Sequence, residues 1–150
     1  MKNIIIIWII IFLVSIQSCK DECSDILCFT PPPPFEFELV DKLSGENLFT
    51  NKTFDPNDIK IINIENQSEV KFLFIKENQY NIIQLSNIGW ENEIVHYIIK
   101  ISSESIFELY VDAQRLNGDC CSYTEYKEIR IENVAFELQE INGVYRILIS

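Results

Sequence analysis

The sequence is poor in glycine, histidine and basic residues. It has four Gly and one His among 150 residues, and 12 Lys and Arg against 23 Asp and Glu give a net charge of −11. Phosphate binding needs clustered Lys and Arg, so we exclude nucleic acid as a partner. Hydrophobic residues make up 47% of the chain and aromatic residues 12%, which is too apolar for a disordered protein.

The sequence also lacks the motifs of common catalytic and cofactor sites. It has no P-loop, no glycine-rich dinucleotide turn, no H-E-x-x-H and no EF-hand loop. A Ser-His-Asp triad would need His96, which alternates with Val95 and Tyr97 in an expected strand, and no G-x-S-x-G sequence supports it. We therefore expect His96 to be a solvated or hydrogen-bonded strand residue, and we expect no cofactor, no metal and no enzymatic activity.

The first eighteen residues have the pattern of a secretory signal peptide. Met1-Lys2-Asn3 gives a positive start, and an apolar run of thirteen residues follows from Ile4 to Ile16. As a helix this run would extend about 20 Å, which is short of the roughly 30 Å hydrocarbon core of a bilayer. A cleaved signal is therefore favoured over the alternative, an uncleaved membrane anchor.

The end of the apolar run resembles the lipobox of bacterial lipoproteins. In Ile16-Gln17-Ser18-Cys19, a branched apolar residue lies three positions before the cysteine and a small residue lies directly before it. The resemblance implies cleavage before Cys19, a diacylglycerol on its thiol, and a fatty acyl chain such as palmitate on its new amino group. Two or three acyl chains anchor a protein stably, since each buried CH₂ contributes about 0.8 kcal/mol.

The next three residues resemble an export signal. Lys20-Asp21-Glu22 is similar to the lysine and two acidic residues that follow the lipidated cysteine in surface lipoproteins of the Bacteroidota. The resemblance implies passage to the outer membrane and then to its outer leaflet; a solvated spacer on an inner-facing protein is the alternative. The chain resembles the small lipoproteins of that group, and this likeness implies no activity.

The cysteine count fits an exported protein. If Cys19 is lipidated, Cys23, Cys28, Cys120 and Cys121 are left, and four cysteines allow three pairings. A bond between the adjacent Cys120 and Cys121 would be strained, so we favour two long-range bridges in which Cys23 and Cys28 each meet one of the vicinal pair. Closing a loop of about 90 residues contributes roughly 4–5 kcal/mol. A metal site or a redox pair is the alternative, but the spacing matches neither well.

Alternating apolar and polar residues from Phe35 onward predict half-buried strands. A three-residue loop over 102–104 would place Ile99 opposite Phe107 and make their apolar faces coincide. A change of parity predicts a bulge or corner near Asn133. Strands are expected around 35–39, 59–64, 70–74, 80–85, 95–101, 107–111, 129–131 and 134–149, the last as a hairpin.

The last hairpin is predicted from Asn142-Gly143, a preferred type I′ turn. Counting outward from a two-residue turn places Leu138 opposite Ile147 and Phe136 opposite Ile149, so both strands should bury the same face. No segment has a helical period with start and stop signals.

These patterns predict an all-β fold with about eight strands, an antiparallel β-sandwich of the Ig-like or transthyretin-like kind. A partly closed β-barrel is the alternative. We expect residues 1–18 to be the signal peptide, residues 19–34 a tether with a stiff proline run, and residues 35–150 one sandwich domain.

Two functional hypotheses follow. In the first, the lipid-anchored sandwich is a non-enzymatic module that binds a protein or glycan of the envelope, or supports a larger complex, with Trp90 in a loop as the best ligand contact. In the second, it is a small envelope hydrolase that uses paired carboxylates, which a buried acidic pair would favour. A third possibility, a protein inhibitor, would have the same sequence features as the binding module. Asp55, Asn57 and Asp58 have ligand types that suit Ca²⁺, although a turn explains them equally well.

Overall fold

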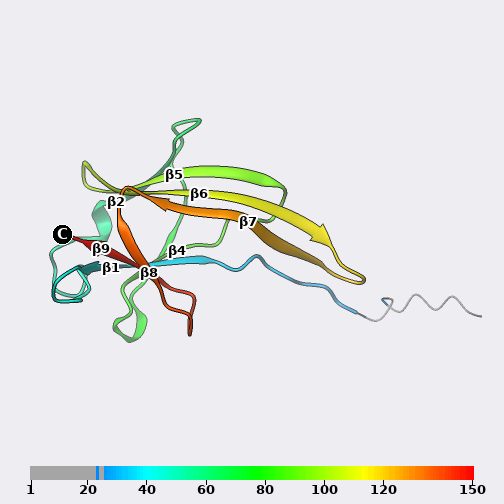
Figure 1. Ribbon diagram of the computed structural model, residues 1–150, viewed down its shortest axis with the longest axis horizontal. Helices are drawn as coiled ribbons and strands as arrows, with labels where there is room; N and C mark the ends of the chain where they lie inside the picture. The colour runs from blue at the N-terminus through cyan, green and yellow to red at the C-terminus, as the bar shows by residue number, and fades with distance from the viewer. Residues whose placement is uncertain (1–22, 24–25) are drawn as a thin grey trace, which may run out of the picture.

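The computed structural model describes Cys23 and residues 26–150 (Figure 1). The expected signal peptide, Cys19 and the Lys20-Asp21-Glu22 sequence lie outside the described residues, so the roles assigned to them stay predictions. In the part of the chain that is described, no helix is both long enough and apolar enough to span a bilayer.

Strands dominate the described chain, which confirms the all-β prediction. There are nine strands, where about eight were predicted, and two short 3-10 helices, η1 (Pro56–Asp58) and η2 (Glu77–Gln79). β3 and β4 are shorter than the alternation over 70–85 predicts. The strands are β1 (Phe35–Asp41), β2 (Ile59–Asn63), β3 (Leu73–Ile75), β4 (Ile82–Leu85), β5 (Glu93–Ile101), β6 (Glu104–Asn117), β7 (Ser122–Glu132), β8 (Ala135–Leu138) and β9 (Tyr145–Ile149).

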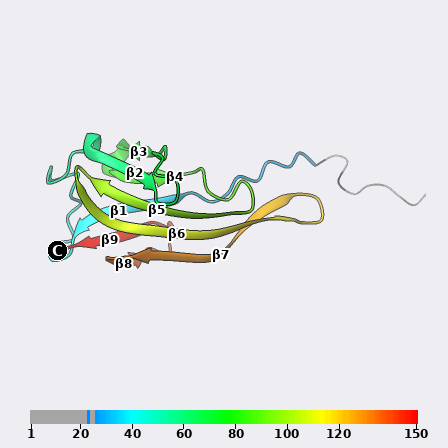
Figure 2. The ribbon, with the colours of Figure 1, turned by 90° about the horizontal axis from the view of Figure 1, so that it is seen from above.

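The strands form two sheets that pack face to face (Figure 2). One sheet has the order β3-β4-β1-β9-β8, and the other has the order β2-β5-β6-β7. Neighbouring strands are antiparallel except β1 and β9, which run parallel. Because both sheets end in separate edge strands, the chain forms the predicted β-sandwich and not the partly closed barrel.

The core lies between the sheets and is built from alternate residues. In β1, Phe35, Phe37 and Leu39 are buried, as the alternation predicts. Phe37 contacts Phe107 of the other sheet with ring centroids 5.0 Å apart, and such an aromatic pair contributes about 0.5–1.5 kcal/mol beyond its buried area. Among the described residues, the buried side chains include no charged or polar one.

The β5–β6 hairpin has the predicted pairing but a different turn. Ile99 lies opposite Phe107, so the apolar faces coincide as predicted. The predicted three-residue loop is wrong, because Ile101 pairs with Glu104 and leaves a two-residue turn at 102–103. A shift of register next to Ile99 gives β6 one extra residue, and this bulge restores the match between the two faces.

The β8–β9 hairpin has a longer turn than predicted. The amide of Gln139 donates a hydrogen bond of 2.9 Å to the carbonyl of Val144, so the turn contains residues 140–143 and not two residues alone. The predicted register is therefore wrong by two residues. Since side chains alternate with a period of two, the same faces still meet. Leu138 pairs with Tyr145, where Ile147 was predicted, and Phe136 pairs with Ile147, where Ile149 was predicted.

The prediction that both strands of this hairpin bury one face is wrong for β8. Ile147 of β9 is fully buried, but all four residues of β8 are exposed, with Phe136 at 42% and Leu138 at 50%. β8 is the edge strand of its sheet, and its inner face is only partly covered.

The chain crosses from one sheet to the other at Asn133, which confirms the predicted corner. Asn133 has a φ of 69°, and asparagine tolerates positive φ better than most residues with a side chain. Its amide donates a hydrogen bond of 2.9 Å to Glu108 of β6. The corner leaves β7 and β8 as the two sheet edges on one side of the sandwich (Figure 2).

Candidate functional site

Two disulfides join the amino-terminal segment to the tip of the β6–β7 hairpin. Cys23 is bonded to Cys120, and Cys28 is bonded to Cys121. The prediction that Cys23 and Cys28 each meet one of the vicinal cysteines is confirmed. The bridges use all four cysteines other than Cys19, so none of these four is a thiolate that would bind a metal.

Residues 26–34, which we call the strap, run along the β6–β7 hairpin (Figure 1). Pro32 is buried, and the Pro33 carbonyl accepts a hydrogen bond of 2.7 Å from the Tyr126 hydroxyl. The prolines at 31–34, expected to form a stiff spacer, are therefore packed against the folded domain.

The strap and the loop 86–92 flank the part of the hairpin that projects from the sandwich. β5 pairs with β6 only as far as Ala113, so the rest of the hairpin has no neighbouring strand on that side. There the Arg115 guanidinium donates a hydrogen bond of 2.7 Å to the Thr30 carbonyl. The Thr124 hydroxyl donates one of 2.6 Å to a carbonyl of the loop. We call this projecting part of the hairpin (114–125), the strap (26–34) and the loop 86–92 together the arm.

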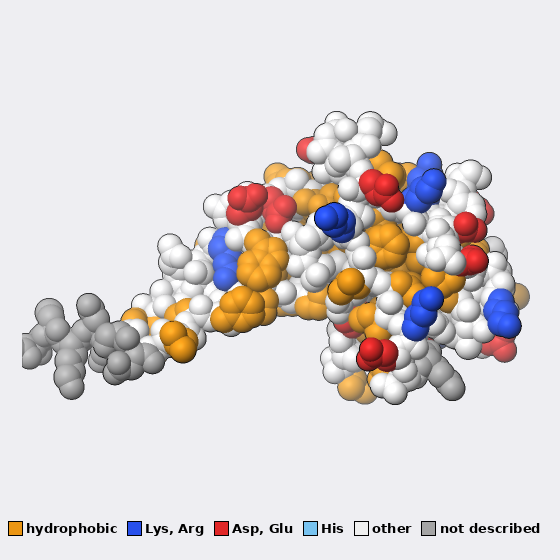
Figure 3. All heavy atoms as spheres, turned by 180° about the vertical axis from the view of Figure 1, so that it is seen from behind, with side chains coloured by type: hydrophobic (Ala, Val, Ile, Leu, Met, Phe, Trp, Pro, Cys, Tyr) orange, Lys and Arg blue, Asp and Glu red, His pale blue; other side chains and the backbone are white. Residues whose placement is uncertain are grey.

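Five large apolar side chains of the arm are exposed, and the space-filling view shows hydrophobic groups gathered along it (Figure 3). The rings of Phe29 and Trp90 lie 6.4 Å apart, and the Trp90 indole N–H donates to the Ser86 carbonyl at 3.0 Å. Trp90, the predicted ligand contact, is thus accessible to a partner. The arm cluster consists of Ile26 (49% exposed), Leu27 (100%), Phe29 (79%), Trp90 (48%) and Tyr123 (49%).

A second apolar surface lies where the edge strands β7 and β8 leave the sandwich open. Ile129 of β7 is 37% exposed, and Phe136 and Leu138 of β8 are also accessible. A cleft of about 380 Å³ lies between these strands and the strap, and we call it the β7–β8 groove. Its walls include Pro33, Pro34, Tyr126, Ile129, Leu138 and Tyr145.

Two tyrosines place neutral polar groups in these apolar walls. Burial raises the pKa of Tyr126 to about 12, and the negative charge of Glu93 adds to the effect. Burial also raises the pKa of Tyr145. Glu36 is the one carboxylate in the lining of the groove. An apolar cleft with a few fixed polar groups suits a binding site for an uncharged segment.

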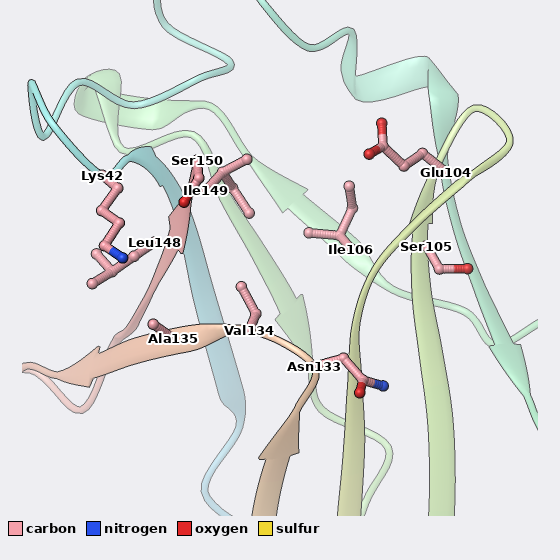
Figure 4. Close-up of a pocket in the computed structure, with 10 residues that line it drawn as sticks. All are labelled: Lys42, Glu104, Ser105, Ile106, Asn133, Val134, Ala135, Leu148, Ile149 and Ser150. Carbon is pink, nitrogen blue, oxygen red and sulfur yellow. The ribbon is translucent and has the colours of Figure 1, made fainter.

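A second cleft, of about 330 Å³, lies beside the carboxyl terminus (Figure 4), at the end of the domain opposite the arm (Figure 1). Lys42 and Glu104 are on opposite sides of it, and the carboxyl-terminal Ser150 lies at its rim. Because these charged groups do not converge on one point, they do not form a catalytic constellation.

His96 lies on the outer face of its sheet and is hydrogen-bonded, as expected. Its Nε2 is 2.9 Å from Glu108, and ligand atoms of His96, Glu108 and Glu132 lie within 4.8 Å of one another. Such a group has the ligand types for a divalent cation. Each member already has a protein partner, however, since Asn133 donates to Glu108 and Arg130 donates to Glu132, both at 2.9 Å.

The acidic turn before β2 is explained by local hydrogen bonds. Asp55 caps η1 and accepts bonds of 2.9 and 2.8 Å from the backbone and side chain of Asn57. Asp58 accepts a bond of 2.8 Å from the Ser102 hydroxyl. These contacts agree with the turn interpretation and do not require Ca²⁺.

The hydrolase hypothesis depends on a buried acidic pair. Among the described residues no charged side chain is buried. The β7–β8 groove and the cleft opposite the arm are each lined by one acid, Glu36 and Glu104 respectively. The hypothesis therefore gains no support from these clefts.

Comparison with protein-family models, with curated proteins and with solved structures gives no match for this chain. Function has to be inferred from the surfaces described above. The sequence pattern did not identify Tyr126, Ile129 and Leu138 as one surface, because alternation cannot tell a covered inner face from an uncovered one. The parity change at Asn133 was the available signal, since it marks where the two strands part.

Proposed function

We propose that this chain is a lipid-anchored lipoprotein of the outer membrane, exposed on the cell surface, whose sandwich is a non-enzymatic binding module. The lipobox-like sequence ending at Cys19 supports the anchor, and Lys20-Asp21-Glu22 supports surface export. The two disulfides are consistent with an oxidising compartment, and they engage all the cysteines except the one that lipidation requires.

The β7–β8 groove is the observation that supports the binding role. Ile129 and Leu138 line the groove from the inner faces of two sheet edges, yet they stay 37% and 50% exposed, and Phe136, beside the groove on β8, is 42% exposed. Full burial of such a side chain contributes about 1.5–3 kcal/mol, so a partner that covered these residues would gain part of that from each. The walls combine proline and aliphatic side chains with the rings of Tyr126 and Tyr145, and Glu36 is the one carboxylate in the lining. A cleft with so few polar groups suits apolar side chains better than the many hydroxyls of a sugar, and we therefore propose an apolar segment of another envelope protein as the ligand.

The anchor is tested by changing the lipidated residue. Cys19→Ala should release the protein from membranes and abolish labelling by a radioactive fatty acid, whereas Cys23→Ala, as a matched cysteine control, should keep the label. Labelling that persists in Cys19→Ala would refute the lipid anchor. Protease treatment of intact cells should degrade the wild-type protein if it is on the surface.

The groove is tested by site-specific photocrosslinking in the cells that produce the protein. A photoreactive phenylalanine at Leu138 should give one discrete protein adduct, and Ile129→Lys should abolish it. The same probe at Leu73, which is 59% exposed on the far edge strand of the same sheet, should not give that adduct. Identical adducts from both positions would refute the groove, and a polysaccharide adduct would favour the glycan alternative.

A further inference from the structure

Exposed apolar side chains are concentrated on the arm. Of the thirteen large hydrophobic residues that are exposed in the described chain, five belong to the arm cluster. Leu27 is fully exposed and Phe29 is 79% exposed, so neither contributes to the core. Exposure of this kind on a short projecting element indicates a contact outside the chain.

The position of the arm relative to the chain start identifies what it contacts. Cys19 is four residues before Cys23, and four residues reach at most about 14 Å. The disulfide from Cys23 to Cys120 then brings the hairpin tip to the same place, with a Cα–Cα distance of 5.2 Å. An acylated Cys19 would therefore hold the tip within reach of the interfacial layer, which is roughly 5–8 Å thick on each side of the hydrocarbon core.

The residue types match that layer. Tryptophan and tyrosine prefer the membrane–water interface because their rings are amphipathic, and the cluster contains Trp90 and Tyr123. The Trp90 indole N–H already donates to the Ser86 carbonyl, so its ring can enter an apolar layer without losing a hydrogen bond to water.

We infer that the arm cluster dips into the lipid interface and sets the orientation of the anchored domain. The inference rests on the proposed lipid anchor. The contact is apolar and shallow, because Glu91 and Asp119 on the same arm are exposed and acidic. These carboxylates keep the arm from going deeper and disfavour anionic lipid. The carboxyl-terminal end of the domain (Figure 1), where the second cleft lies, then faces away from the membrane.

Trp90 is a built-in probe for this contact. The chain has two tryptophans, Trp8 and Trp90, and cleavage before Cys19 removes the first. The acylated mature protein would be reconstituted into phosphatidylcholine vesicles that carry bromine near the headgroup end of the acyl chains. Trp90 emission should shift to the blue and lose intensity relative to vesicles without bromine, as expected for an interfacial indole. Leu27→Asp with Phe29→Asp should remove most of this loss, and both substitutions are at exposed positions that leave the core intact.

The matched control is a variant whose only tryptophan lies at the carboxyl-terminal end of the domain, opposite the arm. Leu43 is 96% exposed, and its neighbour Lys42 bonds to Ile149 beside the carboxyl terminus. In a Trp90→Phe background, Leu43→Trp should show no quenching.

Flotation of the vesicles separates the two proposals. Protein that floats while Trp90 is unquenched would overturn the arm contact and leave the anchor standing, and quenching at both positions would overturn the proposed orientation. Protein that does not float would overturn the anchor. Trp90 emission that responds to an envelope glycan but not to brominated lipid would overturn the arm contact in favour of a glycan platform.

Discussion

The arm and the β7–β8 groove are both apolar surfaces outside the core, but they are held in place differently. The arm projects beyond β5, and its strap is fixed by the disulfide of Cys28, by that of Cys23 just before it, and by hydrogen bonds such as that from Arg115 to Thr30. The groove is continuous with the core, and its walls belong to strands that the sandwich already positions.

The difference shows two ways in which a small domain comes to expose apolar residues. The arm is too thin to enclose a core, so its geometry depends on covalent bonds. The groove is an inner sheet surface that the fold leaves uncovered, so it needs no reinforcement of its own. Tyr126 links the two, because it lines the groove and its hydroxyl donates to the strap at Pro33.

The largest effect is expected from removing the disulfides. Alone, either bridge closes a loop of more than 90 residues, with sequence separations of 97 and 93, and stabilises the fold by roughly 4–5 kcal/mol. Once one bridge exists, the other closes only a short ring worth about 2 kcal/mol. Replacing one cysteine pair by serine should therefore cost about 2 kcal/mol, and replacing both pairs about 7 kcal/mol.

Urea unfolding of the two single-bridge variants and of the variant without bridges would measure this non-additivity. In the Cys19→Ala protein without residues 1–18, which keeps both bridges, thiol titration under non-reducing conditions should detect no reactive cysteine. If removing both bridges cost only the sum of the two single losses, the bridges would stabilise independent regions, contrary to the prediction.

A smaller effect is expected from the ionisation of Tyr126. Its pKa of about 12 in the folded protein exceeds the ordinary value of 10.0, so the unfolded chain loses this proton first as the pH rises. Stability should be unaffected by this group below pH 10 and should fall as the pH rises from 10 toward 12. One proton can contribute no more than about 1.4 kcal/mol per pH unit.

Tyr126→Phe should lessen this alkaline decline, to which Tyr145 and Tyr97 also contribute because burial raises the pKa of both. Tyr80→Phe, at a tyrosine that is 53% exposed, should leave the decline unchanged. The measurement is the free energy of unfolding in urea at a series of alkaline pH values. An unchanged slope in Tyr126→Phe would show that Tyr126 is not shielded from solvent by the strap and the groove.

The smallest effect on stability is expected in the groove. Ile129→Ala and Leu138→Ala should each cost less than about 1 kcal/mol, because both side chains are already partly in water. Ile147→Ala, in the fully buried position next to β8, should cost about 2–5 kcal/mol. Thermal unfolding would compare them. Costs in the groove as large as that at Ile147 would mean that the groove is part of the core and not a ligand surface.

The two hairpins show how far the sequence predicts this fold. For β5–β6 and β8–β9 alike, alternation predicted which faces meet, because a slip of one residue would expose a whole apolar face. It did not predict the turns, since a bulge beside Ile99 or two extra residues before Val144 satisfies the same alternation. Turn length depends on backbone geometry that a preferred pair such as Asn142-Gly143 does not determine alone.

The candidate sites were predictable to different degrees. The pairing of Cys23 and Cys28 with the vicinal cysteines followed from strain in the alternative bond, a local argument. The exposure of Phe136 and Leu138 did not follow from the sequence, because it depends on which strands end as neighbours. Trp90 was singled out as a loop aromatic, but its neighbour Phe29 came from a segment expected to be only a tether.

The disulfides also determine where a force applied to the amino-terminal segment is transmitted to the folded domain. A pull on the chain start would pass through Cys23 into Cys120 and be carried in shear along the hydrogen bonds between β6 and β7. The prolines would carry almost none of that tension. Proteolysis within residues 29–34 would accordingly not shed the domain, since sulfur bridges bypass the cut, and release would require a reductant as well as a protease.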